Sequence, residues 1–337
     1  MTGTPPDPDD DETAAGEFAC IHDLFAPLAA DEPGAFGLAD DAAVLATGPA
    51  TVVTTDTLVE GTHFLPADPP ADVGRKLLRV NLSDLAAMGA APRAYFVNVA
   101  LPRRRGRPWL ADFAQGLAAD QAAFGGVVAG GDLVATPGPP TLTLTALGDP
   151  AGAGVLRRDA ARPGDVICVS GTIGDAVLGL GVLTEALDTT NFTEDERAWV
   201  AAAYRRPQPR LALGRALVGT AGAGMDVSDG LVADLEHLCA ASGVGAMLDA
   251  ARVPLSAPAG RLVAAEPSRL AMLLAGGDDY ELLVTVPGDA LPRAETLAAE
   301  AGVALTPVGA VVAGSGVRVH DAEGRPLALD STGWQHF

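Results

Sequence analysis

The sequence predicts an α/β protein with two domains. In both halves of the chain, short apolar runs typical of strands alternate with segments of helical periodicity. A chain of 337 residues is also long for one hydrophobic core, and its 48% hydrophobic content is enough for two. We therefore expect a disordered acidic tail at 1–15, an N-terminal domain at 16–149 and a C-terminal α/β domain at 150–337.

The N-terminal domain is expected to combine several strands with two long helices. The β-branched run at 52–55 favours a strand. Large apolar residues recur at intervals of three and four between 78 and 88, which predicts a helix that ends at Gly89. The predicted strands are 42–46, 51–57, 94–101, 126–130 and 141–147, and the predicted helices are 71–88 and 108–124.

In the C-terminal domain, strands are expected to be followed by glycine-rich turns and helices. A turn at 162–165 leads into a strand at 166–170, and Gly171 and Gly174 precede a helix. A second strand, 224–227, leads through Ser228-Asp229-Gly230 into another helix, and 245–249 is again a strand. This repeated order supports the α/β prediction for the second half.

Composition limits the possible partners. The chain has 22 Lys and Arg against 43 Asp and Glu, a net charge of −21, which is the wrong sign for a nucleic-acid or anionic-membrane binder. An anionic substrate would need metal ions as bridges. Cys20, Cys168 and Cys239 have no CxxC spacing, so we expect no disulfides and a cytoplasmic location. No apolar run approaches the roughly 20 residues of a membrane helix.

Polar oxygen groups gather where apolar segments end. Thr54 and Thr55 precede Asp56, and hydroxyl and carboxylate oxygens are the ligands that Mg²⁺ selects. The alternative is that threonines are merely common in strands and that Asp56 caps a turn. Carboxylates buried beside apolar segments need a cation or donors, so their number favours a metal site with several ions. The other aspartates at such ends are Asp41, Asp84, Asp132, Asp226 and Asp229.

Two glycine-rich segments could contact phosphate, because glycines let backbone N–H groups approach an oxyanion. They are Gly130-Gly131-Asp132 and Gly276-Gly277-Asp278-Asp279. Taken singly, such a motif is more often a tight turn, and neither segment matches the Walker pattern. Ser228 could cap a helix or, with the helix start, hold a phosphate.

Basic and aromatic candidates are few. Arg158 could clamp a phosphate or lie unengaged on the surface, and His63 follows a glycine turn close to the metal candidates. Trp334 could tether the end of the chain to the core or form a wall of a ligand pocket. No Gly-x-Ser-x-Gly motif or activated cysteine is present, so the residues favour charge neutralisation and phosphoryl transfer over covalent catalysis.

Seven segments, in order and spacing, resemble the thiamine-monophosphate kinase family, which belongs to the aminoimidazole-ribonucleotide-synthetase-like superfamily. The resemblance implies ATP-dependent phosphorylation of thiamine monophosphate with several Mg²⁺ ions. It also implies a homodimer that associates through an N-terminal sheet covered by helices, and a C-terminal α/β domain that completes the site. The segments are Val53–Phe64, Val80–Ala90, Gly130–Asp132, Arg158–Asp165, Met225–Leu231, Gly276–Leu282 and 333–337.

The resemblance also implies roles for individual residues. Three positions depart from the family pattern: Ala39 replaces a glycine, Leu133-Val134 replaces a hydroxyl-bearing pair, and Asp278 replaces a glutamate. The implied metal ligands are Asp41, Thr54, Thr55, Asp56, Asp84, Asp132, Asp226 and Asp229, with Asp84, Asp132 and Asp226 as the catalytic aspartates. The implied ATP contacts are Gly131, Asp132, Arg158 and Ser228, and the implied substrate contacts are His63, Asp278 and Trp334.

Other functions are compatible with the same aspartates. A related ATP-dependent ligase or synthetase would share them. The selenophosphate branch would carry a reactive N-terminal cysteine and the hydrogenase-maturation branch a C-terminal one, whereas this chain ends in His336-Phe337. A non-catalytic, acidic Ca²⁺-binding protein would bind metal without nucleotide turnover.

Overall fold

The structure is a computed structural model that describes residues 17–39, 43, 45, 48, 50–152, 154–329 and 331–334. The chain forms two compact units, each discontinuous in sequence. The first unit takes residues up to 49 together with 55–78 and 92–147, and the second takes 50–54, 79–91 and 148–337. The predicted tail, the strand at 42–46 and Asp41 lie wholly or partly outside the described residues.

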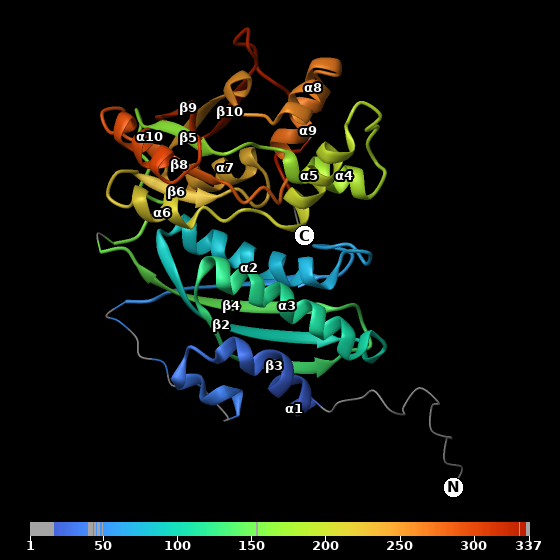
Figure 1. Ribbon diagram of the computed structural model, residues 1–337. Coiled ribbons are helices and arrows are strands. Elements are labelled where there is room, and N and C mark those ends of the chain that lie inside the picture. The colour runs from blue at the N-terminus through green and yellow to red at the C-terminus, as the bar shows by residue number, and fades with distance from the viewer. Residues whose placement is uncertain are drawn as a thin grey trace. The chain divides into compact units, whose positions relative to one another are not determined.

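Most of a four-stranded sheet lies in the first unit, and its strand order is β1-β4-β2-β3 (Figure 1). Strands β2 and β3 pair in parallel, with a bulge between Tyr95 and Phe96. The strands predicted at 51–57, 94–101, 126–130 and 141–147 and both helices are confirmed. Their bounds are β1 (Val52–Val59), α2 (Pro70–Ala87), β2 (Ala90–Leu101), α3 (Gly106–Phe124), β3 (Val127–Ala135) and β4 (Thr141–Pro150).

Helices α2 and α3 approach each other through glycines. A Cβ atom at Gly116 of α3 would lie 1.9 Å from the carbonyl oxygen of Ala71, and one at Gly74 of α2 would lie 2.4 Å from that of Phe113. Short helical turns precede the sheet, and η2 and η3 contact β3. These turns are α1 (Glu17–Cys20), η1 (Ile21–Phe25), η2 (Ala26–Ala29) and η3 (Pro33–Leu38), with η4 (Arg103–Arg105) before α3.

The second unit contains a six-stranded mixed sheet in the order β10-β7-β9-β5-β8-β6. Its strands are β5 (Val166–Ser170), β6 (Ala223–Asp226), β7 (Gly245–Asp249), β8 (Leu282–Val286), β9 (Leu305–Val312) and β10 (Gly316–His320). Its helices are α4 (Asp175–Leu183), α5 (Glu194–Arg205), α6 (Leu211–Leu217), α7 (Leu231–Ser242), η5 (Ala250–Arg252), α8 (Ala257–Ala265), α9 (Arg269–Ala275) and α10 (Leu291–Glu300).

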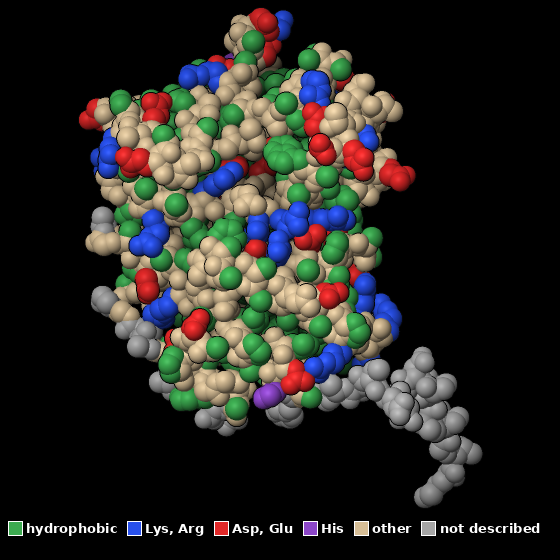
Figure 2. Space-filling model, viewed as in Figure 1, with side chains coloured by type: hydrophobic (Ala, Val, Ile, Leu, Met, Phe, Trp, Pro, Cys, Tyr) green, Lys and Arg blue, Asp and Glu red, His purple; other side chains and the backbone are tan. Residues whose placement is uncertain are grey.

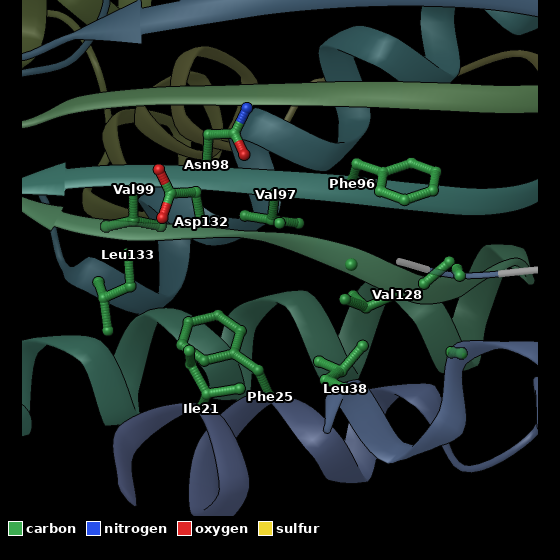
Figure 3. Close-up of a pocket in the computed structure, with 15 residues that line it drawn as sticks. Ile21, Phe25, Leu38, Phe96, Val97, Asn98, Val99, Val128, Asp132 and Leu133 are labelled. Atoms are coloured by element: carbon green, nitrogen blue, oxygen red, sulfur yellow. The ribbon is translucent and has the colours of Figure 1, made fainter. Parts of the chain in front are cut away.

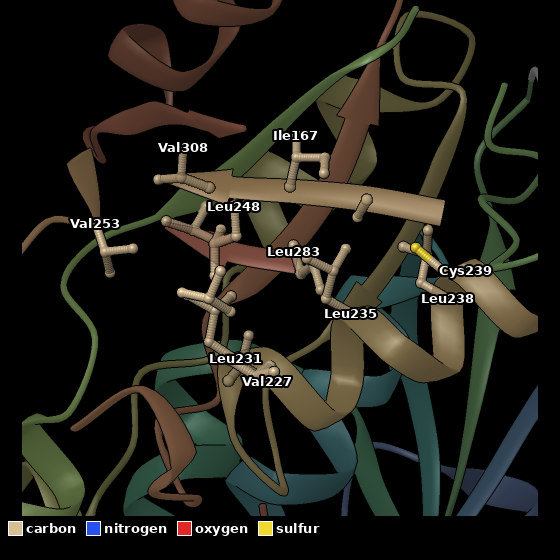
Figure 4. Close-up of a cluster of buried hydrophobic side chains, with 14 of the residues drawn as sticks. Ile167, Val227, Leu231, Leu235, Leu238, Cys239, Leu248, Val253, Leu283 and Val308 are labelled. Carbon is tan, nitrogen blue, oxygen red and sulfur yellow. The ribbon is translucent and has the colours of Figure 1, made fainter. Parts of the chain in front are cut away.

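One hydrophobic core of the second unit lies between helix α7 and this sheet. Leu235 of α7 packs with Ile167 of β5 and Leu283 of β8, and all three side chains are fully buried (Figure 4). Burial of such aliphatic side chains is worth roughly 1.5–3 kcal/mol each. The packing fixes the start of α7, and with it the loop at 227–230 that precedes the helix.

Three features that the composition bears on can be seen in the structure: the surface charges, the cysteines and the apolar character of the helices. On the face shown in Figure 2, Lys and Arg side chains are interspersed with Asp and Glu. Cys20, Cys168 and Cys239 are buried thiols, and none of them is in a disulfide. Among the described helices, none combines the length and the apolar character needed to cross a membrane.

Candidate active site

A cavity of about 400 Å³ in the second unit gathers several of the predicted site residues. The Thr54 hydroxyl of β1 donates to Asp84 Oδ2 at 2.5 Å. The adjacent Ser83 hydroxyl donates to Asp226 Oδ2 at 2.6 Å. Neighbouring residues of α2 thus contact β1 on one side and β6 on the other, and Thr54, Asp84 and Asp226, remote in sequence, come together.

Two arginines line the same cavity. The Arg157 guanidinium forms an ion pair with Asp159, with its Nε 2.9 Å from Oδ1. Arg158 is exposed, and its carbonyl oxygen accepts a hydrogen bond from the Ser242 hydroxyl at 2.8 Å, which fixes the backbone of the loop. The Arg158 guanidinium is therefore the cationic group of this cavity that suits an anionic ligand.

The alternation of side chains along β1 separates the predicted threonine ligands. Thr54 and Asp56 are half-buried, whereas Thr55 is exposed between them, as expected for successive residues of a strand. Thr55 Oγ1 donates to the Leu144 carbonyl at 3.2 Å and accepts from Thr145 Oγ1 at 3.1 Å. The Thr55 side chain is thus engaged with β4 and does not join that of Thr54.

Gly131 and Asp132 lie on β3 of the first unit, where they line a second cavity of about 540 Å³. A Cβ atom at Gly131 would lie 1.9 Å from the Val97 carbonyl oxygen, so only glycine fits against β2. Asp132 is aligned with Asn98 of β2, and both side chains are exposed. Figure 3 shows them close together on neighbouring strands, with the apolar side chain of Phe25 on another wall. This arrangement offers oxygen and amide groups at one end of an apolar cavity.

His63, also in the first unit, has a defined ring orientation. The Val59 N–H donates to His63 Nδ1 at 3.0 Å, and the Lys76 ammonium donates to the His63 carbonyl oxygen at 2.9 Å. Because a backbone N–H can only donate, Nδ1 is the acceptor, and the proton of the neutral ring is on Nε2. Nε2 is therefore a hydrogen-bond donor suited to a phosphate oxygen.

Four further candidates meet at one loop of the second unit, Ser228-Asp229-Gly230: Ser228 and Asp229 lie in it, and Asp278 and Trp334 are hydrogen-bonded to it. The Ser228 carbonyl accepts from the Asp278 N–H at 2.8 Å, and the Asp229 carbonyl accepts from the Trp334 N–H at 2.9 Å. The Trp334 indole is 55% exposed, so its backbone is held while its ring is open to solvent. Gly230, not Ser228, is the N-cap of α7, so the helix-capping alternative for Ser228 is not realised.

The loop is held by Asp234, a residue that our sequence analysis missed. Asp234 is buried, and its Oδ2 accepts from the N–H groups of Ser228, Asp229 and Gly230 at 2.9, 3.0 and 3.1 Å. Burial, and then the nearby charge of Asp229, raise the pKa of Asp234 to about 6, although the three N–H bonds oppose the shift. An aspartate in the first turn of a helix was the available signal.

The two aspartates of the Gly276–Asp279 motif have different environments. Asp278 is half-buried, whereas Asp279 is buried and accepts from the N–H groups of Gly174 and Ala176 at 2.7 and 3.2 Å. Burial raises the pKa of Asp279 well above its ordinary value. Asp279 therefore caps the start of α4. Glu281 is similarly engaged, by a two-point ion pair with Arg210.

The donor set suits Mg²⁺. Thr54, Asp84 and Asp226 of the second unit offer only oxygen atoms, and Mg²⁺ is commonly bound through one or two carboxylates and substrate phosphates rather than by a complete protein cage. In the part of the chain that is described, which omits Asp41, no group of three or more His, Cys, Asp or Glu side chains is arranged to hold a metal ion. These residues therefore fit a metal that substrate phosphates help to bind.

Comparison with known proteins identifies the family. Residues 39–149 match the family "AIR synthase related protein, N-terminal domain", and residues 162–322 match "AIR synthase related protein, C-terminal domain". The chain is 41% identical to thiamine-monophosphate kinase of Caulobacter vibrioides over 95% of this chain and 90% of that protein. It is 37% identical to the Salmonella typhimurium enzyme over 96% of this chain and 99% of that one.

Solved structures of thiamine-monophosphate kinases are similar to this chain in fold as well as in sequence. The thiamine-monophosphate kinase of Stenotrophomonas maltophilia superposes with a TM-score of 0.77 at 38% identity, covering 86% of this chain and 91% of that one. The complex of AaThiL with AMPPCP and TMP superposes with a TM-score of 0.75 at 30% identity, covering 96% and 97%. The two-domain, AIR-synthase-like fold class is thereby confirmed. With these matches over nearly its whole length, the chain belongs to the thiamine-monophosphate kinase family and is an enzyme of that class.

Proposed function

We propose that this enzyme phosphorylates thiamine monophosphate with ATP by direct in-line transfer. A phosphate oxygen of thiamine monophosphate bonds to the γ-phosphorus while the bond from that phosphorus to the β–γ bridging oxygen breaks, giving thiamine diphosphate and ADP. The acceptor is already an anion near neutral pH, so no strong general base is required. The main barrier is bringing two polyanions together.

The observation that carries this proposal is the cavity where Asp84 and Asp226, from remote elements, lie beside Arg158. Two hydroxyl-bonded carboxylates and one guanidinium can position a phosphate chain and its counter-ions, and no nucleophilic side chain is required. Thr54, Asp84 and Asp226, with Asp56, Asp132, Asp229 and Asp41, would hold Mg²⁺. Bound Mg²⁺ would neutralise charge on the transferring phosphoryl group.

The remaining roles follow the family resemblance. We assign Gly131, Asp132, Arg158 and Ser228 to ATP, and His63, Asp278 and Trp334 to thiamine monophosphate. The exposed indole of Trp334 supports this assignment, because a cationic thiazolium ring stacks well on such a surface. The His63 Nε2–H is suited to the substrate phosphate.

We also propose that the enzyme works in the cytoplasm as a homodimer. Both parts rest on the sequence: the dimer on the family resemblance and the compartment on the widely spaced cysteines. Sedimentation-equilibrium analysis at micromolar concentration should give twice the 33.9 kDa chain mass. A monomer at that concentration would contradict the proposed dimer but would not bear on the proposed reaction.

One assay tests the activity. ADP release from ATP and Mg²⁺ should require thiamine monophosphate, and thiamine diphosphate should form in equal amount. An acidic Ca²⁺-binding protein would give no turnover, and a relative with another acceptor would not respond to thiamine monophosphate. Incubation with γ-labelled ATP alone tests directness, since a labelled, phosphorylated enzyme would rule out single-step transfer.

A further inference from the structure

Asp234 is a buried carboxylate of the second unit that holds a loop carrying two candidate site residues. It is 1% exposed, and one of its oxygens accepts all three successive N–H groups of residues 228–230. Hydrogen bonds to an ionised acceptor are roughly twice as strong as those between neutral groups. A loop whose N–H groups share one such acceptor is fixed in a single conformation.

This loop is contacted from two sides by segments that carry substrate-site candidates. On one side, a Cβ atom at Gly277 would lie 2.4 Å from the Ser228 carbonyl oxygen, next to the point where Asp278 N–H donates. On the other side, a Cβ atom at Gly333 would lie 2.5 Å from Ala233 Cβ and 2.8 Å from the Asp229 carbonyl oxygen. Both segments therefore pack directly on backbone that Asp234 holds.

We propose that Asp234 is a positioning residue that aligns the ATP-side and substrate-side groups of the site through this one loop. The proposal rests on the proposed function, because Ser228 is assigned to ATP and Asp278 and Trp334 to thiamine monophosphate. The side chains of Ser228 and Asp229 move with the loop. The backbone N–H groups of Asp278 and Trp334 donate hydrogen bonds to its carbonyl oxygens. A change at Asp234 should affect both substrates, although Asp234 contacts neither.

The central test is the effect of Asp234→Ala on the two KM values. Loss of the shared acceptor frees the loop, so KM for ATP and KM for thiamine monophosphate should both rise by roughly 3–30-fold. Asp234→Asn retains an acceptor oxygen at the same position and should recover most of the loss. By contrast, Ser228→Ala should raise KM for ATP alone, and Trp334→Ala should raise KM for thiamine monophosphate alone.

Asp165→Ala provides the matched control. Asp165 is also buried, at 6% exposure, and its Oδ2 accepts from the Arg162 N–H at 3.0 Å and the Thr285 hydroxyl at 3.3 Å. Its described side-chain hydrogen bonds reach neither the loop nor the segments packed on it. This variant should lose thermal stability while both KM values stay within about twofold of the wild type. Equal KM changes in both variants would mean a general loss of stability and would overturn the proposal.

A second measurement does not depend on activity. The chain has three tryptophans, so replacing Trp109 and Trp199 with Phe leaves Trp334 as the single tryptophan, which can be excited apart from the tyrosines. In that background, Asp234→Ala should lower the fluorescence anisotropy of Trp334, and Asp165→Ala should not. If Asp234→Ala does not fold, Asp234→Asn is measured instead and should give a smaller change in the same direction.

The two possible failures are distinguishable. A wild-type enzyme that releases no ADP in response to thiamine monophosphate would refute the proposed function but leave the anisotropy prediction standing. An active wild type, combined with unchanged KM values and unchanged anisotropy in Asp234→Ala, would refute the role of Asp234 and leave the function intact.

Discussion

At the scale of single residues, the site depends on carboxylates whose neighbours differ. Asp84 is half-buried and accepts one hydroxyl, from Thr54. Asp234 and Asp279 accept only backbone N–H groups among their described hydrogen bonds and hold the ends of helices or loops. Partial exposure and a hydroxyl neighbour indicate a group available to a ligand, whereas full engagement by backbone indicates a structural or positioning role.

Asp84→Asn should slow the chemical step. The substitution keeps the shape of the side chain but removes one negative charge from the proposed Mg²⁺ site, so kcat should fall by roughly 10²–10³ while the fold is unchanged. Steady-state kinetics at saturating Mg²⁺ measures this. Asp112→Asn, on the exposed face of α3, is the control and should keep wild-type kcat. Near wild-type kcat in Asp84→Asn would show that Asp84 only positions Thr54.

Trp334→Ala should weaken binding of thiamine monophosphate. An indole face over a thiazolium ring contributes about 0.5–2 kcal/mol in both ground and transition states, so KM should rise by roughly 2–30-fold with kcat and KM for ATP nearly unchanged. Trp334→Phe should recover most of the loss. Because Trp334 is 55% exposed, it packs little against the core, and its removal should cost little stability if it were only a tether. A lower Tm with an unchanged KM would favour the tether after all.

Asp279 should make stability depend on pH. Burial raises its folded pKa well above the ordinary 3.8, so the folded state binds a proton that the unfolded state has released. Its contribution is fully present below 3.8 and is lost as pH rises through the folded value. Relative to Asp279→Asn, the wild type should therefore lose stability as the pH rises above 3.8 towards the folded pKa, as measured by urea unfolding at each pH. A pH-independent difference would contradict the shift.

At the scale of secondary-structure elements, close helix packing depends on glycine. Gly116 allows α3 to approach the Ala71 carbonyl of α2. Gly214 of α6 has the same role in the second unit, since a Cβ atom there would lie 1.9 Å from the Ala86 carbonyl oxygen. Within a helix, glycine lowers stability by about 0.5–1 kcal/mol relative to alanine. At these positions that loss accompanies a close contact between helix and backbone that a larger residue would prevent.

Gly116→Ala should destabilise the protein. The new methyl group would overlap backbone that cannot move as a flexible side chain would, at a cost of roughly 1–3 kcal/mol, seen as a lower midpoint in urea. Gly260→Ala is the matched control, because Gly260 of α8 has nothing within 4 Å of the added Cβ. There, improved helix propensity should stabilise by about 0.5–1 kcal/mol. Two variants of equal stability would show that α2 and α3 can separate.

At the scale of the whole molecule, an acidic chain is expected to bind two anionic substrates. With a net charge of −21, ATP should bind well only when its own charge is compensated. Within the second unit, the cavity beside Arg158 also contains Asp84 and Asp226, and its other arginine, Arg157, is already paired with Asp159. Nucleotide binding should therefore depend strongly on a divalent cation.

Ligand-induced stabilisation tests this dependence. A non-hydrolysable ATP analogue at 100 times its Kd should stabilise the enzyme by about 2.7 kcal/mol, which raises Tm. The rise should occur with Mg²⁺ and disappear when EDTA is added. Arg158→Ala should reduce it at fixed analogue concentration. The same rise in Tm with and without EDTA would show that metal is not needed for nucleotide binding.

The sequence by itself determined the α/β class, most elements and the family. Strand and helix periodicity are local properties: the helix expected at 71–88 spans 70–87, and the strand at 166–170 has the expected bounds. The short blocks around Asp84 and Asp278 were specific enough in combination to indicate thiamine-monophosphate kinase. Composition alone also indicated that charge neutralisation would be central.

Only the tertiary structure decided which residues share a site. The second compact unit takes Thr54 and Asp84 from the first half of the sequence and groups them with Asp226. A hydrogen bond between remote segments decided that Asp279 caps α4, whereas Asp234 holds the neighbouring loop at 228–230 by local hydrogen bonds. The physical reason is that periodicity records which face of an element is buried. Which partner satisfies a buried carboxylate depends on chain segments about 30 to 140 residues apart, which one sequence does not encode locally.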